Sequence, residues 1–207
     1  PMSPAERPTD PVVLISGATG HLGGVAAARF AADGARLALV GTDRGRLDAL
    51  GARLGLSADR WLVAPGDLRQ AAGARAVAAA VPERFGRIDV ALHLVGGWRG
   101  GTPVTDLDPA DLQAMVDQHL WTTFHLAQAV VPGMVERGWG RLAAVTSPFA
   151  ATPGAKMAAY GVGKAAQEAL LGSLAREVGG HGVTVNLVAV RTIDAEHARE
   201  REPNDHN

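Results

Sequence analysis

The chain has 207 residues, of which 47% are hydrophobic, and its formal net charge is −1. This length suits one domain with a sizeable core, and the balanced charge argues against nucleic acid or an anionic membrane as the main partner. Cysteine is absent, so no disulfide holds the fold, and no apolar run reaches the roughly 18 residues of a membrane span. The first residues, PMSPAERPTDP, do not resemble a signal peptide. We therefore expect a cytoplasmic protein in which residues 1–10 form a disordered arm.

Strand-like and helix-like segments alternate along the rest of the chain. Apolar runs at residues 12–16, 36–40, 61–64, 89–95, 141–147 and 183–190 predict six buried strands. Segments of helical character follow at residues 22–33, 44–54, 69–84, 109–137 and 157–178. Gly34 closes the first helix, and the long fourth helix is expected to break or kink around Pro132. This order indicates an α/β fold with three layers, in which helices cover both faces of a doubly wound parallel sheet.

Three glycines, Gly17, Gly20 and Gly23, are spaced G-x-x-G-x-x-G between the first predicted strand and the first helix. Glycine permits a tight turn and lets a pyrophosphate approach the helix N-terminus, where free N–H groups favour negative charge. The alternative is a tight turn without a ligand, since glycine is abundant here, with 26 residues. The loop residues that we expect to bind a dinucleotide are Gly17, Thr19, Gly20, His21, Leu22 and Gly23.

The tip of the second predicted strand reads Val40-Gly41-Thr42-Asp43-Arg44. An acidic residue at this place binds the ribose hydroxyls of the adenosine, whereas a basic one accepts a 2′-phosphate. Asp43 and Arg44 therefore favour opposite cofactors, and Thr42 or Asp43 is also a candidate N-cap of the next helix. Through Thr42 and Arg44, we expect NADP(H) to be preferred over NAD(H).

The stretch from Val145 to Lys164 holds the only tyrosine, Tyr160, and both lysines, Lys156 and Lys164. Ser147 lies at the end of the fifth predicted strand, while Tyr160 and Lys164 are four residues apart and share a face of the next helix. A free phenol titrates near pH 10, and a neighbouring ammonium favours the phenolate, so the pair suits proton transfer to or from a substrate oxygen. The alternative is a helix with an exposed lysine and a half-buried tyrosine.

With these motifs the chain resembles the short-chain dehydrogenase/reductase family, over about residues 11–194. The resemblance implies a single Rossmann domain, NAD(P)(H) as cofactor, and Ser147, Tyr160 and Lys164 as the catalytic residues. It implies that Ser147 orients the substrate oxygen, that Tyr160 is the acid/base, and that Lys164 binds the nicotinamide ribose and assists the phenol. Further positions that match the family pattern are Asp67 with Leu68 near the adenine, Gly96 after the fourth strand, and Asn186 in the sixth.

Several residues depart from the family pattern. His21 replaces the second glycine of the usual loop, and His93-Leu94-Val95-Gly96 replaces Asn-Asn-Ala-Gly; we assign no chemistry to His93. His119 stands where many members carry the Asn of a proton relay. It is either a relay residue, through its imidazole or its backbone carbonyl, or a packed helix histidine. Val190-Arg191 replaces Pro-Gly after the sixth strand, and residues 195–207 are expected to be a polar tail, flexible or incomplete.

These observations leave three functions open. The first is an NAD(P)(H)-dependent oxidoreductase that interconverts a carbonyl and an alcohol, with carbonyl reduction implied by the resemblance. The second is a dinucleotide-binding regulator or scaffold with weak or lost turnover, and the third is another enzyme class on this fold, such as an epimerase or dehydratase. We expect residues 98–105 and 148–156 to line the pocket, with Trp98 as a substrate wall or a surface anchor. We further expect a small-molecule substrate, no bound metal, no nucleic-acid or membrane partner, and a homodimer or homotetramer.

Overall fold

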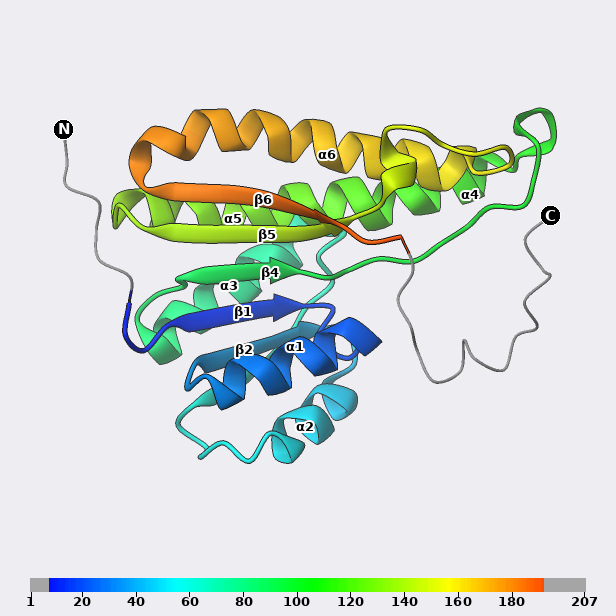
Figure 1. The fold of residues 1–207 in the computed structure, drawn as a ribbon. Coiled ribbons are helices and arrows are strands. Elements are labelled where there is room, and N and C mark those ends of the chain that lie inside the picture. The colour runs from blue at the N-terminus through cyan, green and yellow to red at the C-terminus, as the bar shows by residue number, and fades with distance from the viewer. Residues whose placement is uncertain (1–7, 192–207) are drawn as a thin grey trace.

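The computed structural model of this chain describes residues 8–191. Six strands alternate with helices and helical turns (Figure 1). The elements are β1 (Val12–Ser16), α1 (His21–Ala32), β2 (Arg36–Gly41), α2 (Arg44–Arg53), β3 (Trp61–Pro65), α3 (Ala71–Phe85), β4 (Val90–His93), η1 (Val104–Asp106), α4 (Pro109–Val116), η2 (Asp117–Trp121), α5 (Thr122–Glu136), β5 (Gly140–Thr146), η3 (Pro148–Ala150), α6 (Ala158–Val178), η4 (Gly179–His181) and β6 (Val183–Ala189). Each strand begins and ends within two residues of its predicted segment.

The strands form one parallel sheet in the order β3-β2-β1-β4-β5-β6. The direction of strand order reverses between β1 and β4, and Ser16 at the end of β1 is in register with His93 at the end of β4. In open sheets of this kind, ligands bind outside the carboxyl ends of the strands at such a switch point. The predicted doubly wound α/β fold is therefore confirmed, and it places the candidate site at the right-hand end of the sheet in Figure 1.

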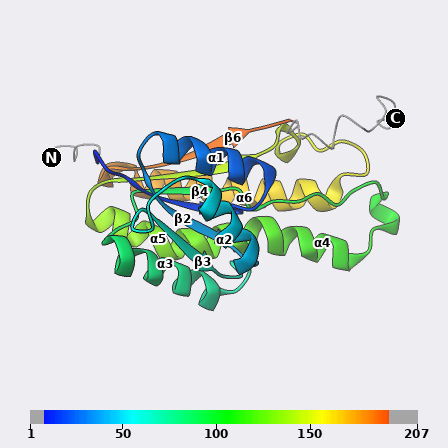
Figure 2. The ribbon, with the colours of Figure 1, turned by 90° about the horizontal axis from the view of Figure 1, so that it is seen from below.

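Helices cover both faces of the sheet and enclose two hydrophobic cores. Figure 2 shows α1 on one side of the strands and α3 and α5 on the other. Because successive side chains of a strand point to opposite faces, Val13 and Ile15 of β1 pack in the core under α1 and α2. Val12 and Leu14 pack instead in the core formed with α3, α5 and α6. This double burial explains why the strands are apolar along their whole length.

Helix ends follow the local signals in the sequence. Gly34 closes α1 with φ of 80°, and its N–H bonds the carbonyl of Ala31 while that of Ala35 bonds the carbonyl of Phe30. Asp43, rather than Thr42, is the N-cap of α2, because its carboxylate accepts the backbone N–H of Arg46 at 3.0 Å.

We expected the long helix to break or kink around Pro132, and it does not break there. Pro132 lies inside the continuous helix α5, and the interruption is the wider π-helical turn η2, about a dozen residues earlier. Pro132 lies on the exposed side of α5. The long helical stretch is therefore α4, η2 and α5 in succession.

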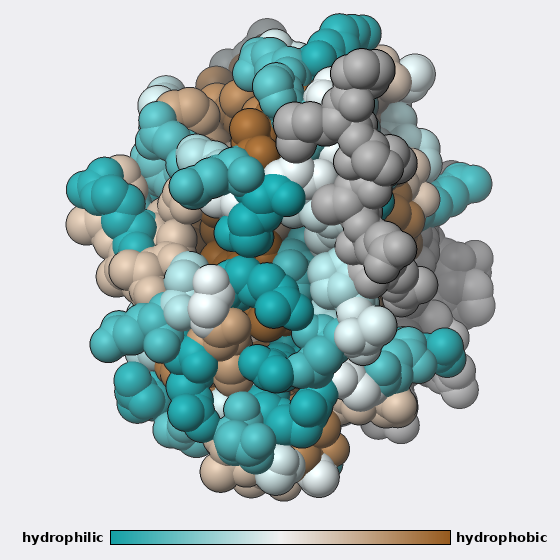
Figure 3. All heavy atoms as spheres, turned by 90° about the vertical axis from the view of Figure 1, so that its left-hand side faces the viewer, coloured by the Kyte–Doolittle hydropathy of each residue, from teal (hydrophilic) through white to brown (hydrophobic). Residues whose placement is uncertain are grey.

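The end of the molecule where the strands begin shows mainly hydrophilic residues (Figure 3). Here the Asp10 carboxylate pairs with Arg60 at 2.7 Å and with Arg36, and these arginines lower the pKa of Asp10. Asp10 belongs to the predicted disordered arm; residues 1–7 of that arm and the tail at 195–207 lie outside the described residues. Within residues 8–191, no helix combines the length and apolar character needed to cross a membrane.

Candidate active site

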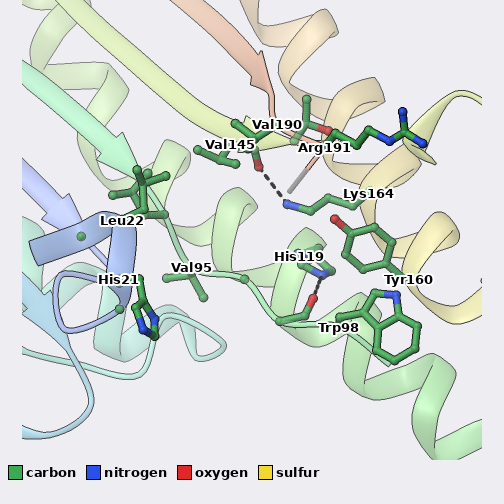
Figure 4. A pocket seen from close by; sticks show the side chains of 17 residues that line it. His21, Leu22, Val95, Trp98, His119, Val145, Tyr160, Lys164, Val190 and Arg191 are labelled. Carbon is green, nitrogen blue, oxygen red and sulfur yellow. Dashed lines mark hydrogen bonds between the residues drawn. The ribbon is translucent and has the colours of Figure 1, made fainter. Parts of the chain in front are cut away.

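A cavity of about 490 Å³ opens at the carboxyl ends of β1 and β4. Figure 4 shows Tyr160 and Lys164 on one side of it, with His21 and Leu22 of α1 on the other. Its lining residues are Gly17, Gly20, His21, Leu22, Gly23, Leu94, Val95, Gly96, Gly97, Trp98, His119, Val145, Thr146, Tyr160, Lys164, Val190 and Arg191. The fold thus brings the predicted glycine loop and the Tyr-x-x-x-Lys pair to one space, although they are separated by more than a hundred residues in the chain.

The glycine loop leaves no room for side chains at two of its positions. Gly17 has φ of 73°, and a Cβ there would lie 2.8 Å from the Leu94 carbonyl group. A Cβ on Gly23 would lie 2.3 Å from the carbonyl oxygen of Gly17. The N-terminus of the twelve-residue helix α1 follows, and its N-cap, Gly20, offers no side-chain hydrogen bond to the first backbone N–H groups. These N–H groups and the helix dipole therefore favour an anionic group beside the loop.

A second cavity, of about 420 Å³, lies on the other side of the glycine loop. Thr19, Thr42, Asp67 and Leu68, which sequence reasoning assigned to the cofactor, line it. Gly17 and Val95 line both cavities, so the two are neighbours. Two adjoining cavities on either side of a glycine loop suit a ligand with two halves joined by a pyrophosphate.

Arg44, which we expected to bind the cofactor, does not line the second cavity. Arg44 lines none of the described cavities, whereas Arg46 donates to the carbonyl oxygen of Thr19 in the glycine loop at 3.0 Å. Arg69 lines the second cavity and pairs with Asp67 at 2.8 Å. The Arg69 guanidinium, through its hydrogen bonds, lowers the pKa of Asp67, so this carboxylate is ionised at neutral pH.

Lys164 is buried, with 4% of its surface exposed, and lies one helical turn after half-buried Tyr160. Its ammonium donates to the carbonyl oxygen of Val145 at 2.8 Å and to Oε1 of Gln167 at 3.0 Å. Burial lowers the pKa of Lys164 to about 8, although Glu168 opposes this shift. Figure 4 shows the Lys164 amino group and the Tyr160 hydroxyl directed into the same part of the cavity.

Ser147 does not reach the cavity in this conformation. It is buried directly after β5, and its Oγ accepts the backbone N–H of Phe149 at 3.3 Å as the N-cap of η3. Its two predecessors, Val145 and Thr146, line the cavity instead. The structure therefore brings Tyr160 and Lys164 together as predicted, whereas Ser147 is hydrogen-bonded within its own helical turn.

His119 lies in the turn η2 and is fully buried. Its Nε2 donates to the carbonyl oxygen of Gly97 at 3.1 Å, because a carbonyl can only accept. Burial, then the charge of Lys164, lowers the pKa of His119 to about 4, so the ring is neutral and Nδ1 is an acceptor. Within residues 8–191, this buried Nδ1 has no hydrogen-bond partner. The His119 backbone carbonyl, by contrast, accepts the hydroxyl of Thr123 at 2.6 Å.

His93 joins three elements through hydrogen bonds to Ser16 and Thr122. The Thr122 hydroxyl donates its proton to the carbonyl of Gln118 at 2.6 Å, so it accepts from Nε2 of His93 at 3.2 Å. Nδ1 of His93 then accepts from the Ser16 hydroxyl at 2.7 Å. Burial lowers the pKa of His93 to about 3, and the ring is neutral. The residue to which we assigned no chemistry therefore ties β1, β4 and α5 together.

Sequence reasoning missed two polar residues behind the site, Gln167 and Thr123, both buried. They are linked to each other and to Lys164 by hydrogen bonds. A signal was present, because Gln167 lies three residues after Lys164 and four before Leu171, on the stripe that α6 turns inward. Sequence reasoning also missed Gln118, whose amide donates to the carbonyl of Gly96 at 2.8 Å.

Of the loops predicted to line the pocket, residues 98–105 contribute Trp98 to the first cavity and Arg99 to the second, whereas residues 148–156 line none of the described cavities. The backbone N–H of Gly101 donates to the carbonyl of Lys156 at 2.8 Å, which joins the loop after β4 to the loop before α6. Lys156 has φ of 60°, an uncommon conformation for a residue with a side chain. Trp98 lines the cavity with 59% of its surface exposed, and Figure 4 shows its indole beside Tyr160. No cluster of His, Cys, Asp and Glu among the described residues is arranged to hold a metal ion.

The fold and the glycine loop define the class of dinucleotide-binding α/β proteins. Within that class, the family model described as short chain dehydrogenase matches residues 11–206. A relative from Thauera aromatica, (2S)-[(R)-hydroxy(phenyl)methyl]succinyl-CoA dehydrogenase subunit BbsC, is 37% identical over 92% of this chain and 76% of its own length. A second, 1,6-dihydroxycyclohexa-2,4-diene-1-carboxylate dehydrogenase of Pseudomonas putida, is 34% identical over 90% of this chain and 68% of its own.

The solved structure of levodione reductase has a TM-score of 0.82 and 31% identity over 88% of this chain and 72% of that one. The chain belongs to the short-chain dehydrogenase family.

A dinucleotide fits the residues present here. The carbonyl groups around Gly17 and Gly23 leave no space for a Cβ, so backbone alone faces a ligand there, and the open N-terminus of α1 suits a pyrophosphate.

Proposed function

We propose that this protein is an NAD(P)(H)-dependent oxidoreductase that interconverts a carbonyl and an alcohol and works mainly as a reductase. One observation carries the proposal: Tyr160 and Lys164, one helical turn apart, face the same cavity as the glycine loop. The two relatives from Thauera aromatica and Pseudomonas putida are both named as dehydrogenases, which supports the same class of reaction.

Tyr160 is the proposed acid/base, and it donates its hydroxyl proton to the substrate oxygen as the carbonyl becomes an alcohol. When bound, the dinucleotide supplies the hydride, which adds to the carbonyl carbon. The charged ammonium of Lys164 stabilises the phenolate left on Tyr160 and holds the nicotinamide ribose. Ser147 orients the substrate oxygen, which requires its hydroxyl to turn from the N–H of Phe149 toward the cavity.

His119 is proposed to continue the proton path. Its backbone carbonyl already accepts the Thr123 hydroxyl, whereas its Nδ1 is buried without a partner among the described residues. This difference favours the imidazole over the carbonyl as the group that accepts a hydrogen bond during turnover. The ring also holds Gly97 in place through Nε2.

The residues proposed to hold the dinucleotide are Gly17, Thr19, Gly20, His21, Leu22, Gly23, Thr42, Asp67, Leu68, Gly96 and Lys164. NADP(H) is the proposed preference. Thr42 lines the second cavity, whereas the carboxylate of Asp43, the acidic residue after β2, accepts the backbone N–H of Arg46 as the N-cap of α2. Arg46, which reaches the glycine loop, replaces Arg44 in this assignment.

A ring-bearing substrate is proposed, because the exposed indole of Trp98 offers a flat apolar surface beside Tyr160. Relatives named for a phenyl-bearing thioester and a cyclohexadiene carboxylate support this choice. A cytoplasmic location and a homodimer or homotetramer complete the proposal; light scattering of the purified protein tests the assembly.

Purified protein tests the reaction directly. We expect it to oxidise NADPH with a member of a panel of cyclic and aryl ketones, and Tyr160→Phe to abolish this turnover while dinucleotide binding is retained. A panel without turnover for protein that binds NADPH would support the second candidate, a dinucleotide-binding regulator. One observation favours that alternative: the hydroxyl of Ser147 bonds the N–H of Phe149 instead of facing the cavity.

A further inference from the structure

The ammonium of Lys164 has two fixed partners in the interior. An ammonium carries three N–H donors and no acceptor. One donor faces the carbonyl oxygen of Val145 and a second faces Oε1 of Gln167, at 2.8 and 3.0 Å. This leaves a third N–H for the cavity, and Figure 4 shows the amino group of Lys164 near the Tyr160 hydroxyl. The direction of that third donor is therefore determined by the two interior contacts.

Gln167 is itself held from behind. Its Nε2 donates to Oγ1 of Thr123 at 2.9 Å, and the Thr123 hydroxyl donates to the backbone carbonyl of His119 at 2.6 Å. Because lysine can only donate, the amide of Gln167 must turn its oxygen to Lys164 and its nitrogen to Thr123. Every donor in this chain of hydrogen bonds points from Lys164 toward His119, and every acceptor is used once.

The burial of these hydrogen-bonded side chains argues against a role for Gln167 in hydrophobic packing alone. Gln167 is 0% exposed and Thr123 is 2% exposed. A buried amide costs free energy unless its polar atoms are paired, and an apolar side chain would fill the same stripe of α6 more favourably. The amide dipole places its negative end 3.0 Å from a buried cation, which offsets the loss of water around that cation.

We propose that Gln167, supported by Thr123, is a positioning residue that holds the Lys164 ammonium in its charged form and aims its free N–H at the ligand cavity. The catalytic consequence rests on the proposed function, in which Lys164 binds the dinucleotide and stabilises the Tyr160 phenolate. The effect on Lys164 itself does not depend on turnover.

In the described part of the chain, the other charged or titratable groups near Lys164 do not bond its ammonium. Glu168, on the same helix, accepts the hydroxyl of Thr146 at 2.6 Å and does not bond the ammonium. The pKa values of His93, from β4, and His119, from η2, are lowered far enough for both rings to be neutral at pH 7. The remaining titratable side chains that line the cavity are His21, Tyr160 and Arg191. Gln167 and Val145 are therefore the direct polar partners.

The chain offers a direct probe, because it contains only two lysines. Protein labelled with ¹³C at lysine Cε gives two NMR signals, and Lys156→Arg identifies the exposed one. The Lys164 signal of the wild type should titrate near pH 8. We expect Gln167→Met, which keeps the volume and removes the acceptor, to move this midpoint down by about one unit. Gln167→Glu should move it up by about one unit, because a carboxylate favours the ammonium.

A second pair of variants keeps the proposal testable if a Gln167 variant does not fold. Thr123→Val removes the support of the amide and should move the midpoint in the same direction as Gln167→Met, whereas Thr123→Ser keeps the hydroxyl and should leave it near the wild-type value. An unchanged midpoint in Gln167→Met, Gln167→Glu and Thr123→Val, or shifts of any other sign, overturns the proposal.

An activity arm separates this proposal from the proposed function. If NADPH turnover exists, Gln167→Met should raise the KM for the dinucleotide at least threefold. Gln167→Glu should move the alkaline limb of the pH profile of turnover to higher pH. Absence of turnover in the wild type would count against the proposed function, while the lysine titration would still decide the role of Gln167.

Discussion

The imidazole of His119 meets the phenol ring of Tyr160 edge to face, with ring centroids 5.4 Å apart and planes at 88°. The same imidazole holds the carbonyl of Gly97, so one side chain links η2, the loop after β4 and the proposed acid/base on α6. Edge-to-face pairs of this kind contribute about 0.5–1.5 kcal/mol beyond their area burial. The position of the Tyr160 ring therefore depends on the packing of His119.

Two substitutions separate the roles of His119. His119→Gln can still donate to Gly97 but lacks the ring and its Nδ1 acceptor. We expect kcat to fall about tenfold or more with an unchanged dinucleotide Kd. His119→Phe keeps a ring beside Tyr160 but loses both nitrogens, so we expect the same loss of kcat and about 1 kcal/mol less stability. Steady-state kinetics and urea unfolding measure both; full turnover in His119→Phe would contradict the relay role.

The buried histidines predict a loss of stability in mild acid. The folded-state pKa is lowered to about 3 for His93 and about 4 for His119, below the unfolded value of 6.5. Both states are neutral above that value, whereas below it only the unfolded state gains a proton. The free energy of unfolding should therefore fall from about pH 6.5 toward pH 4, with a limiting slope of about 1.4 kcal/mol per pH unit for each histidine.

His93→Asn tests this prediction, since it removes one of the two groups. Urea unfolding between pH 4.5 and 6.5 avoids the range in which Asp10 and Asp67, whose pKa values are lowered, take up protons. We expect the variant to be less stable at pH 7, because Ser16 and Thr122 lose a partner, but to show a shallower decline with falling pH. Parallel curves for variant and wild type would count against a buried neutral His93.

Local patterns in the sequence were sufficient for the fold and for part of the site. The alternation of apolar runs with helices, the spacing of Gly17, Gly20 and Gly23, and the four-residue spacing of Tyr160 and Lys164 each depend on neighbours in the chain. The structure brings these segments to one cavity, because parallel strands place their carboxyl ends at the same edge.

Contacts between distant segments account for what was missed. Gln167 and Thr123 are 44 residues apart, and nothing in either segment alone indicates their hydrogen bond. The break in the long helix falls at η2, where two successive side chains, Gln118 and His119, reach the carbonyls of Gly96 and Gly97. Proline 132 carried a stronger local signal but remains within α5, because tertiary packing of that helix outweighs one missing hydrogen bond.

The glycine loop provides a prediction with a matched control. Gly23→Ala would place a Cβ 2.3 Å from the carbonyl of Gly17, so the loop must shift, and we expect dinucleotide affinity to fall at least tenfold. A Cβ at Gly24, the next residue, meets nothing within 4 Å. Gly24→Ala should therefore keep the affinity and add up to about 1 kcal/mol of helix stability. Calorimetric titration with NADPH measures both; equal affinities in the two variants would contradict the role of the loop.

Arg44 and Arg46 make the final prediction, which concerns the choice of cofactor. Arg46 extends from α2 to the carbonyl of Thr19 in the glycine loop. We propose that it binds the 2′-phosphate of NADP⁺ from there. We expect Arg46→Ala to weaken NADP⁺ binding at least fivefold and NAD⁺ binding less than twofold, because only NADP⁺ carries the extra anion. Arg44→Ala, which changes a side chain outside the described cavities, should leave both affinities near the wild-type values. If Arg44→Ala alone removed the preference for NADP⁺, the assignment would return to Arg44; if the wild type preferred NAD⁺, the proposed cofactor preference would be wrong.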